Sequence, residues 1–145
     1  MIPYAMKYIS EEDILVFEKI RNIVVELPDI DLGIDEKGKE IILSCHILAR
    51  AIAKVFSLRY VDGYFFPNFC HSWVLSSNGH LIDVYPVAVL GGPIMMVKGD
   101  NPLLVNSPVK WHYKKTSARE VSFGLFSKPS FRRSVRRIES YLRKM

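Results

Sequence analysis

The stretch from residue 71 to residue 85 constrains the fold of this chain more than any other part of the sequence. Two runs rich in β-branched and aromatic residues, 71–75 and 81–85, flank the turn-forming sequence Ser-Ser-Asn-Gly-His at 76–80. Short runs of this kind around an Asn-Gly pair are typical of a β-hairpin. We therefore expect two antiparallel strands here, in a sheet to which the rest of the chain must be fitted.

The register of this hairpin decides whether His71 and Asp83 can meet, because side chains alternate between the two faces of a strand. A two-residue loop at 78–79 would place them on opposite faces. A three-residue loop at 77–79 makes them diagonal neighbours on one face, with Cβ atoms roughly 7 Å apart or less. Gly79 suits the left-handed position that closes a three-residue loop, so we predict this form.

The residues before the hairpin predict two helices. The first spans 10–27, with Ser10 as its N-cap and acidic residues in its first turn. Its apolar stripe at helical spacing consists of Ile14, Phe17, Ile20, Val24 and Leu27. The second ends near Phe56 and is apolar around much of its circumference, so we expect it to be central and largely buried. Ser44 would cap an inner start and place Cys45 in the first turn, but the pattern leaves that boundary open.

Strands follow one another after residue 58, and a basic helix ends the chain. Further strand candidates are 59–66, 94–97 and 109–113, and the last helix is expected at about 131–143. Consecutive strands after two helices favour an α+β fold over a doubly wound parallel sheet. A chain of 145 residues suits one domain. We expect that domain to comprise an N-terminal helix in 1–30, a core in 40–115 and a basic helix in 129–145.

Composition narrows the class of protein. Hydrophobic residues make up 49% of the chain and charged residues 24%, which is typical of a globular domain. No run approaches the ~20 apolar residues of a membrane span, and the first residues lack the pattern of a signal peptide. We therefore expect a cytoplasmic protein without a membrane span. Two cysteines are too few for a disulfide framework.

Three residues in the predicted elements have the order and placement of a cysteine nucleophile and its partners. Cys45 lies near the start of the central helix, where the helix dipole favours a thiolate. His71 lies on one strand of the hairpin and Asp83 on the next. A base within reach of the thiol, oriented by a third group, is the arrangement that activates such a nucleophile. The residues therefore predict a triad of Cys45, His71 and Asp83.

The segment from about 41 to 87 resembles the core of transglutaminase-like proteins, which have a papain-like fold. The resemblance rests on a helix cysteine followed by His-Ser-Trp at 71–73 and Ile-Asp-Val-Tyr-Pro at 82–86. It implies a central helix packed on an antiparallel sheet, and no metal or cofactor. It also implies a peptidase, amidase or transglutaminase-type acyl transfer on a peptide, amide or acyl substrate. Cys45 would attack the carbonyl carbon, with backbone N–H groups there in the oxyanion hole. His71 would move the proton, Asp83 would orient His71, and Trp73 would pack beneath them.

Other assignments of the same residues remain open. Cys70 is a second thiol, but it precedes His71 on a strand and should face the opposite side. His46 lies about 100° around the helix from Cys45, which predicts a poor base for that thiol. A zinc site could combine Cys45-His46, Cys70-His71 and His80, although adjacent Cys-His pairs lack the usual spacing of structural zinc ligands.

The positive net charge of +5 belongs mainly to the C-terminal part of the chain. Four arginines fall at i, i+1, i+4 and i+5 on the predicted last helix, namely Arg132, Arg133, Arg136 and Arg137. Opposite them runs an apolar stripe of Val135, Ile138, Tyr141 and Leu142. The basic face is either solvated or contacts nucleic acid or an acidic partner. The alternative function is therefore a non-catalytic binding module of the same fold.

Overall fold

The computed structural model describes residues 9–27, 33–41, 43–65, 69–85, 93–97, 113–116 and 124–145. The helices are α2 (Glu11–Val25), α3 (Cys45–Phe56), the 3-10 turn η2 (Leu125–Ser127) and α5 (Pro129–Arg143). The strands are β1 (Arg59–Phe65), β2 (Phe69–Leu75), β3 (Leu81–Asp83), β4 (Ile94–Met96) and β5 (Tyr113–Lys115). The fold is α+β, and within the described residues no helix is long and apolar enough to cross a membrane.

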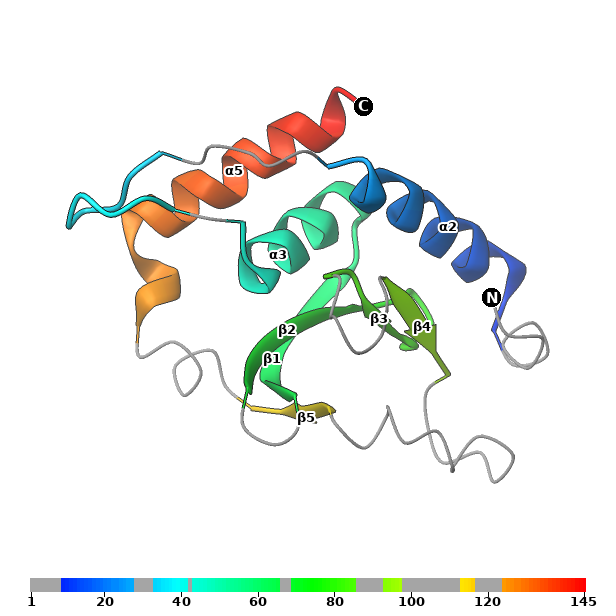
Figure 1. Cartoon of the computed structure of the whole chain (residues 1–145). Helices are drawn as coiled ribbons and strands as arrows, with labels where there is room; N and C mark the ends of the chain where they lie inside the picture. The colour runs from blue at the N-terminus through cyan, green and yellow to red at the C-terminus, as the bar shows by residue number, and fades with distance from the viewer. Residues whose placement is uncertain are drawn as a thin grey trace.

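The described strands form one antiparallel sheet in the order β4-β3-β2-β1-β5. Helix α3 lies between this sheet and α5, and α2 flanks the same layer (Figure 1). The layering follows from burial on α3, whose apolar residues point both toward the sheet and toward the helices. Its buried residues are Ile47, Leu48, Ala49, Ala51, Ile52 and Ala53. The prediction of a central, largely buried helix is confirmed.

The core joins all three helices to the hairpin. Ile52 of α3, Ile20 of α2, Val74 of β2, Ile82 of β3 and Ile138 of α5 belong to one apolar cluster, each without exposed surface. Burying a side chain of this size contributes roughly 1.5–3 kcal/mol. This packing fixes α3 against the two hairpin strands, which is the contact that positions the site described below.

The start of α3, which the sequence left open, is at Cys45. The Ser44 hydroxyl accepts a hydrogen bond from the N–H of Ile47 at 3.3 Å and caps the helix. At the other end Ser57 adopts a left-handed conformation with φ of 54° and ends the helix. The thiol of Cys45 is therefore carried by the first helical residue.

The hairpin has the predicted three-residue loop. Val74 pairs with Ile82 and Leu75 pairs with Leu81. The Ser76 N–H donates to the carbonyl of His80 at 2.8 Å and closes the loop. Gly79 has φ of +87°, the left-handed conformation that the prediction required. In this register residues 71 and 83 lie on one face.

The loop of the hairpin is held by the N-terminus of α2. The Asp13 carboxylate accepts hydrogen bonds from the Ser76 hydroxyl at 2.8 Å and the Asn78 amide at 3.0 Å. The Asp13 N–H also donates to the predicted N-cap, the Ser10 hydroxyl, at 3.2 Å. An acidic residue of the first turn of α2 therefore also clamps a turn more than 60 residues away in the chain.

The ends of the other elements differ slightly from the predictions. Helix α5 begins at Pro129, because proline has the φ that suits a first helical residue. Strand β3 stops at Asp83 instead of Tyr85. Of the strand predicted at 109–113, only Tyr113 lies within the described residues, and it begins β5.

Candidate active site

The thiol of Cys45 lies half-buried at the N-terminus of α3. The first N–H groups of a helix have no intrahelical partner and carry partial positive charge, which stabilises an anion. Within the described residues, Ser44 satisfies the N–H groups of Ile47 and Leu48. Among the described residues, the two N–H groups before them, at Cys45 and His46, have no partner outside the helix and can face an anion at the thiol.

His71 and Asp83 lie together on the face that the register predicts. The His71 Nε2 and the Asp83 Oδ2 are 2.7 Å apart. Both residues are buried, with 5% and 0% of their surface exposed. Because an ionised carboxylate only accepts, Nε2 carries the proton, and Nδ1 is the ring nitrogen left to face another group.

Tyr113 of β5 completes the surroundings of the Asp83 carboxylate. Its hydroxyl donates to Oδ2 at 2.6 Å, and the Tyr85 N–H donates to Oδ1 at 3.1 Å. Burial, and then the negative charge of Asp83, raise the pKa of Tyr113 above its ordinary value, so the phenol stays protonated and donates. The sequence predicted a strand ending at Tyr113 but gave no signal of this contact, because β5 reaches the site by pairing with β1.

The surroundings of Cys45 and His71 favour a thiolate and an imidazolium. Burial alone would raise the pKa of the Cys45 thiol, but hydrogen bonds from His46 and His71, with their charges, lower it to about 6. Burial alone would lower the pKa of His71, but its hydrogen bonds to Asp83 and Cys45 raise it to about 9. Between these two values the sulfur is negative and the imidazole positive.

His46 also influences the thiol, although helix geometry predicts that it is a poor base for Cys45. The prediction considered only the angle between neighbouring side chains on a helix. In the structure His46 lies close enough to Cys45 to help lower the pKa of the thiol. The His46 Nδ1 lies 2.6 Å from the Ser72 hydroxyl, next to His71 on β2. This bond to a strand residue holds the His46 ring in place.

A second buried carboxylate orients this imidazole through Ser72. The Ser72 hydroxyl donates to the Asp62 Oδ1 at 2.5 Å, so its oxygen accepts from Nδ1–H of His46. Asp62 is itself fixed by two hydrogen bonds from the Arg50 guanidinium, at 2.9 and 2.7 Å. The chain of donors leaves the His46 Nε2 as the nitrogen available to the sulfur. Cys45 therefore has two imidazoles, each backed by an aspartate.

Aromatic rings enclose His71. Trp73 is 3% exposed, and its ring centroid lies 6.1 Å from that of His71 and 5.2 Å from that of Tyr113. The Phe65 ring lies 6.0 Å from the imidazole, edge to face. These rings exclude water from the His71–Asp83 pair, which strengthens its hydrogen bond.

Two residues of the alternative assignments, Cys70 and His80, are not among the groups around the Cys45 thiol. Cys70 is exposed while the next residue, His71, is buried, so the two face opposite sides of β2 as alternation predicts. His80 is buried in the hairpin. Among the described residues no three His, Cys, Asp or Glu side chains gather in a way that would hold a metal ion.

Comparison with protein-family models, with curated proteins and with solved structures found no significant match to this chain. The geometry of the site therefore carries the functional argument.

Proposed function

We propose that this protein is a cysteine-dependent acyl-transfer enzyme with a transglutaminase-like, papain-like core, acting as a peptidase or amidase when water is the acceptor. The observation that carries the proposal is the His71–Asp83 hydrogen bond of 2.7 Å beside a helix-start thiol. In this arrangement the thiol is the nucleophile and the histidine is its base. The buried aspartate orients the histidine.

In the first half of the reaction the Cys45 thiolate attacks the carbonyl carbon of an amide. A carbon–sulfur bond forms, and the oxyanion faces the N–H groups at the start of α3. His71, protonated at Nδ1, then gives that proton to the amide nitrogen as the carbon–nitrogen bond breaks. The products are a thioester on Cys45, a free amine and a neutral His71.

In the second half the neutral His71 removes a proton from water or from an acceptor amine. The activated oxygen or nitrogen attacks the thioester, and the carbon–sulfur bond breaks. A carboxylic acid or a new amide leaves, and the thiolate–imidazolium pair is restored. Asp83 holds the imidazole in one orientation through both halves and remains ionised.

Thiol alkylation tests the proposal without a known substrate. At pH 6 we expect iodoacetamide to label Cys45 about tenfold faster than an ordinary thiol, because its pKa is lowered to about 6. The His71→Ala substitution removes a hydrogen bond and a positive charge, so labelling at pH 6 should slow by about tenfold. Peptide mapping by mass spectrometry assigns the adduct, with the exposed Cys70 as the internal reference.

A Cys70→Ser variant is the matched control and should keep the fast phase. An inert Cys45 beside a labelled Cys70 would contradict the assignment of the nucleophile. For turnover, we expect a bell-shaped dependence of kcat/KM on pH with limbs near the two pKa values, about 6 for the thiol and about 9 for His71. A non-catalytic binding module would label without turning over any amide.

A further inference from the structure

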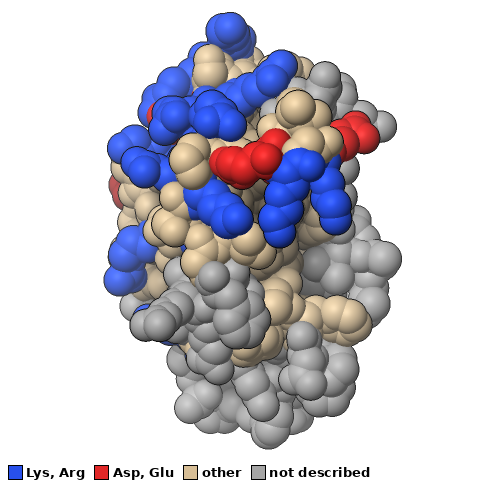
Figure 2. Space-filling view, turned by 90° about the vertical axis from the view of Figure 1, so that its left-hand side faces the viewer, with Lys and Arg blue, Asp and Glu red and all other residues tan. Residues whose placement is uncertain are grey.

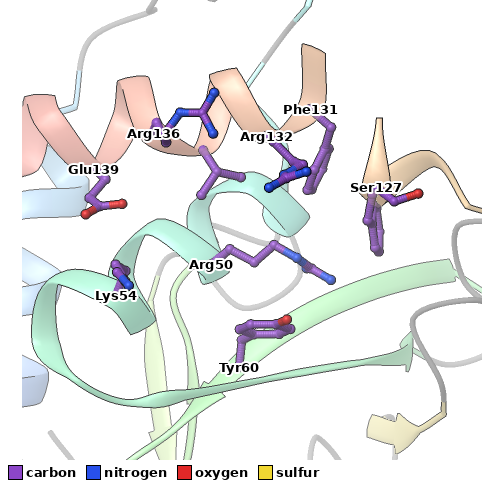
Figure 3. A pocket seen from close by; sticks show the side chains of 10 residues that line it. Arg50, Lys54, Tyr60, Ser127, Phe131, Arg132, Arg136 and Glu139 are labelled. Carbon is purple, nitrogen blue, oxygen red and sulfur yellow. The ribbon is translucent and has the colours of Figure 1, made fainter. Parts of the chain in front are cut away.

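A groove lies between α3, β1, η2 and α5 (Figure 3). It has a volume of about 440 Å³. Its principal lining residues are Lys54, Tyr60, Phe126, Phe131, Arg132 and Arg136. Figure 2 shows a face of the molecule on which Lys and Arg side chains gather. The groove therefore combines an apolar wall with a basic rim.

The positive charge of the groove is not neutralised by the described residues. Lys54, Arg132 and Arg136 form no ion pair there, whereas the groove's carboxylate, Glu139, pairs with Arg143 at 3.1 Å. The guanidinium of Arg50 is already bound to Asp62 on both of its arms. Three uncompensated cations around one groove favour a ligand with negative charge.

Each ring of the aromatic wall of the groove already has one face against another side chain of the protein. The Arg50 guanidinium lies 4.3 Å from the Tyr60 ring and 4.3 Å from the Phe126 ring. Phe126 also stacks on Phe131, with centroids 4.7 Å apart. Single-stranded nucleic acid binds by stacking bases on open aromatic faces. Because these rings already have one face occupied, they leave less open surface for stacked bases. They favour a ligand that packs aliphatic groups against ring edges, as an acidic peptide does.

The groove is next to the candidate active site, with one side chain, His46, between its wall and Cys45. Phe126, which forms its wall, lies 4.7 Å from the His46 ring between centroids. His46 in turn lowers the pKa of the Cys45 thiol, so it lies close to the sulfur. A peptide whose reacting carbonyl lies at Cys45 would need only a few residues to reach the groove beside Phe126.

We propose that the groove is a subsite for an acidic segment of the peptide substrate, a proposal that rests on the acyl-transfer function above. Aspartate or glutamate side chains of the segment pair with Lys54, Arg132 and Arg136. Its apolar side chains pack against Phe131 and Val135, which line the same groove. The subsite selects substrates by charge beside the reacting bond and takes no part in bond breaking.

The test uses the full-length chain with Cys45→Ala, so that binding is measured without turnover. The probes are fluorescein-labelled 12-residue peptides that alternate glutamate with leucine or phenylalanine. Matched peptides with glutamine and an oligothymidylate of equal charge are the comparisons. Fluorescence anisotropy should show that the glutamate peptides bind and that Arg132→Ala with Arg136→Ala weakens this binding by about tenfold.

Arg133→Ala with Arg137→Ala is the matched control, because it removes the same charge from the next positions of α5, which do not line the groove. This variant should bind the glutamate peptides within about twofold of the parent. An equal loss in both pairs, preference for oligothymidylate, or no binding of the glutamate peptides would overturn the subsite.

The thiol reports separately on the proposed function. With Cys45 intact, the Arg132→Ala and Arg136→Ala variant should react with iodoacetamide at the parent rate, because neither arginine contacts the thiol. A reactive Cys45 with no peptide binding rejects the subsite alone. Peptide binding with an inert Cys45 rejects the acyl-transfer function on which the subsite depends, and with it the role proposed for the groove.

Discussion

At the scale of single residues, the Cys45 thiol is unusual in having two imidazole partners. His71 reaches it from β2 with Asp83 behind, and His46 reaches it from the same helix with Ser72 behind. In the proposed reaction only His71 transfers a proton to or from the substrate. We interpret His46 as a positioning residue, whose contact lowers the pKa of the thiol while His71 transfers the proton.

The contribution of His46 can be measured through the pH dependence of alkylation. His46→Ala should move the midpoint of Cys45 labelling to higher pH and slow labelling at pH 6 by about tenfold, because one hydrogen bond to a charged group is lost. Ser72→Ala should shift the midpoint in the same direction, since it frees the His46 ring from its carboxylate. Iodoacetamide labelling across a pH series, read by mass spectrometry, measures both shifts.

Labelling at pH 10 is the internal control, because the thiol is ionised in every variant there and the rates should converge. Circular dichroism shows whether each variant keeps its helices. An unchanged midpoint in a folded His46→Ala chain would show that His71 alone maintains the thiolate.

At the scale of elements, the hairpin loop is held by a contact from outside the hairpin. Asp13, 3% exposed at the start of α2, accepts hydrogen bonds from two residues of the loop region, Ser76 and Asn78. The Ser76 hydroxyl also accepts from the His80 N–H at 3.0 Å. The clamp favours the three-residue loop, and that loop places residues 71 and 83 on one face. The geometry of the candidate site is thereby linked to a helix that contributes no residue to it.

Removing the clamp should lower stability. We expect Asp13→Ala to reduce the free energy of unfolding by about 2 kcal/mol, because two hydrogen bonds to a buried carboxylate are lost. Urea unfolding followed by tryptophan fluorescence measures the change, since Trp73 is buried beside the site. Glu12→Ala is the matched control: it removes the same charge from the same turn at an exposed position and should cost less than about 1 kcal/mol. Equal losses in the two variants would assign the effect to the helix dipole instead of the clamp.

At the scale of the whole molecule, the loop before α3 is joined to the last helix. The N-cap residue of α5, Lys128, provides no side-chain cap. Instead the Glu36 carboxylate accepts from the N–H of Ser130 at 2.6 Å and from its hydroxyl. These residues are 94 positions apart, so the contact joins the loop before α3 to the start of α5. It also fixes the end of α5 that carries the groove arginines.

This contact should make stability depend on pH below 5. The Ser130 hydroxyl, and then backbone N–H groups of Glu36 and Ser130, lower the pKa of Glu36 from 4.5 to about 2. A lowered pKa in the folded state stabilises the fold above the unfolded value of 4.5, and that stabilisation is lost as the pH falls toward 2. Glu36→Gln should therefore lower the Tm at pH 7, and the difference from the parent should shrink between pH 4.5 and 2.

Glu40→Gln is the control, because it removes the same charge from an exposed position of the same loop. Its Tm should follow that of the parent at each pH. A Glu36→Gln difference that stays constant down to pH 2 would show that the contact does not depend on the carboxylate charge.

Sequence alone determined the local parts of this protein. The helix caps were predictable because the Ser10 and Ser44 side chains bond to backbone N–H groups only three residues away. The hairpin loop was predictable because Gly79 can adopt the left-handed conformation that a three-residue loop needs. The pairing of His71 with Asp83 followed from the same local rule, since the length of one loop sets the register of two strands. The α+β class followed from the order of those elements.

Only the tertiary structure decided which distant groups meet at the thiol. His46 was rejected on helix geometry alone, and its role depends on Ser72 and Asp62 from two different strands. Tyr113 reaches Asp83 because β5 pairs with β1. The four arginines of α5 form one face by periodicity, but only the packing of α5 on α3 separates the two that line a groove. Local sequence sets the conformation of each element, whereas these contacts depend on how the elements pack, which periodicity does not encode.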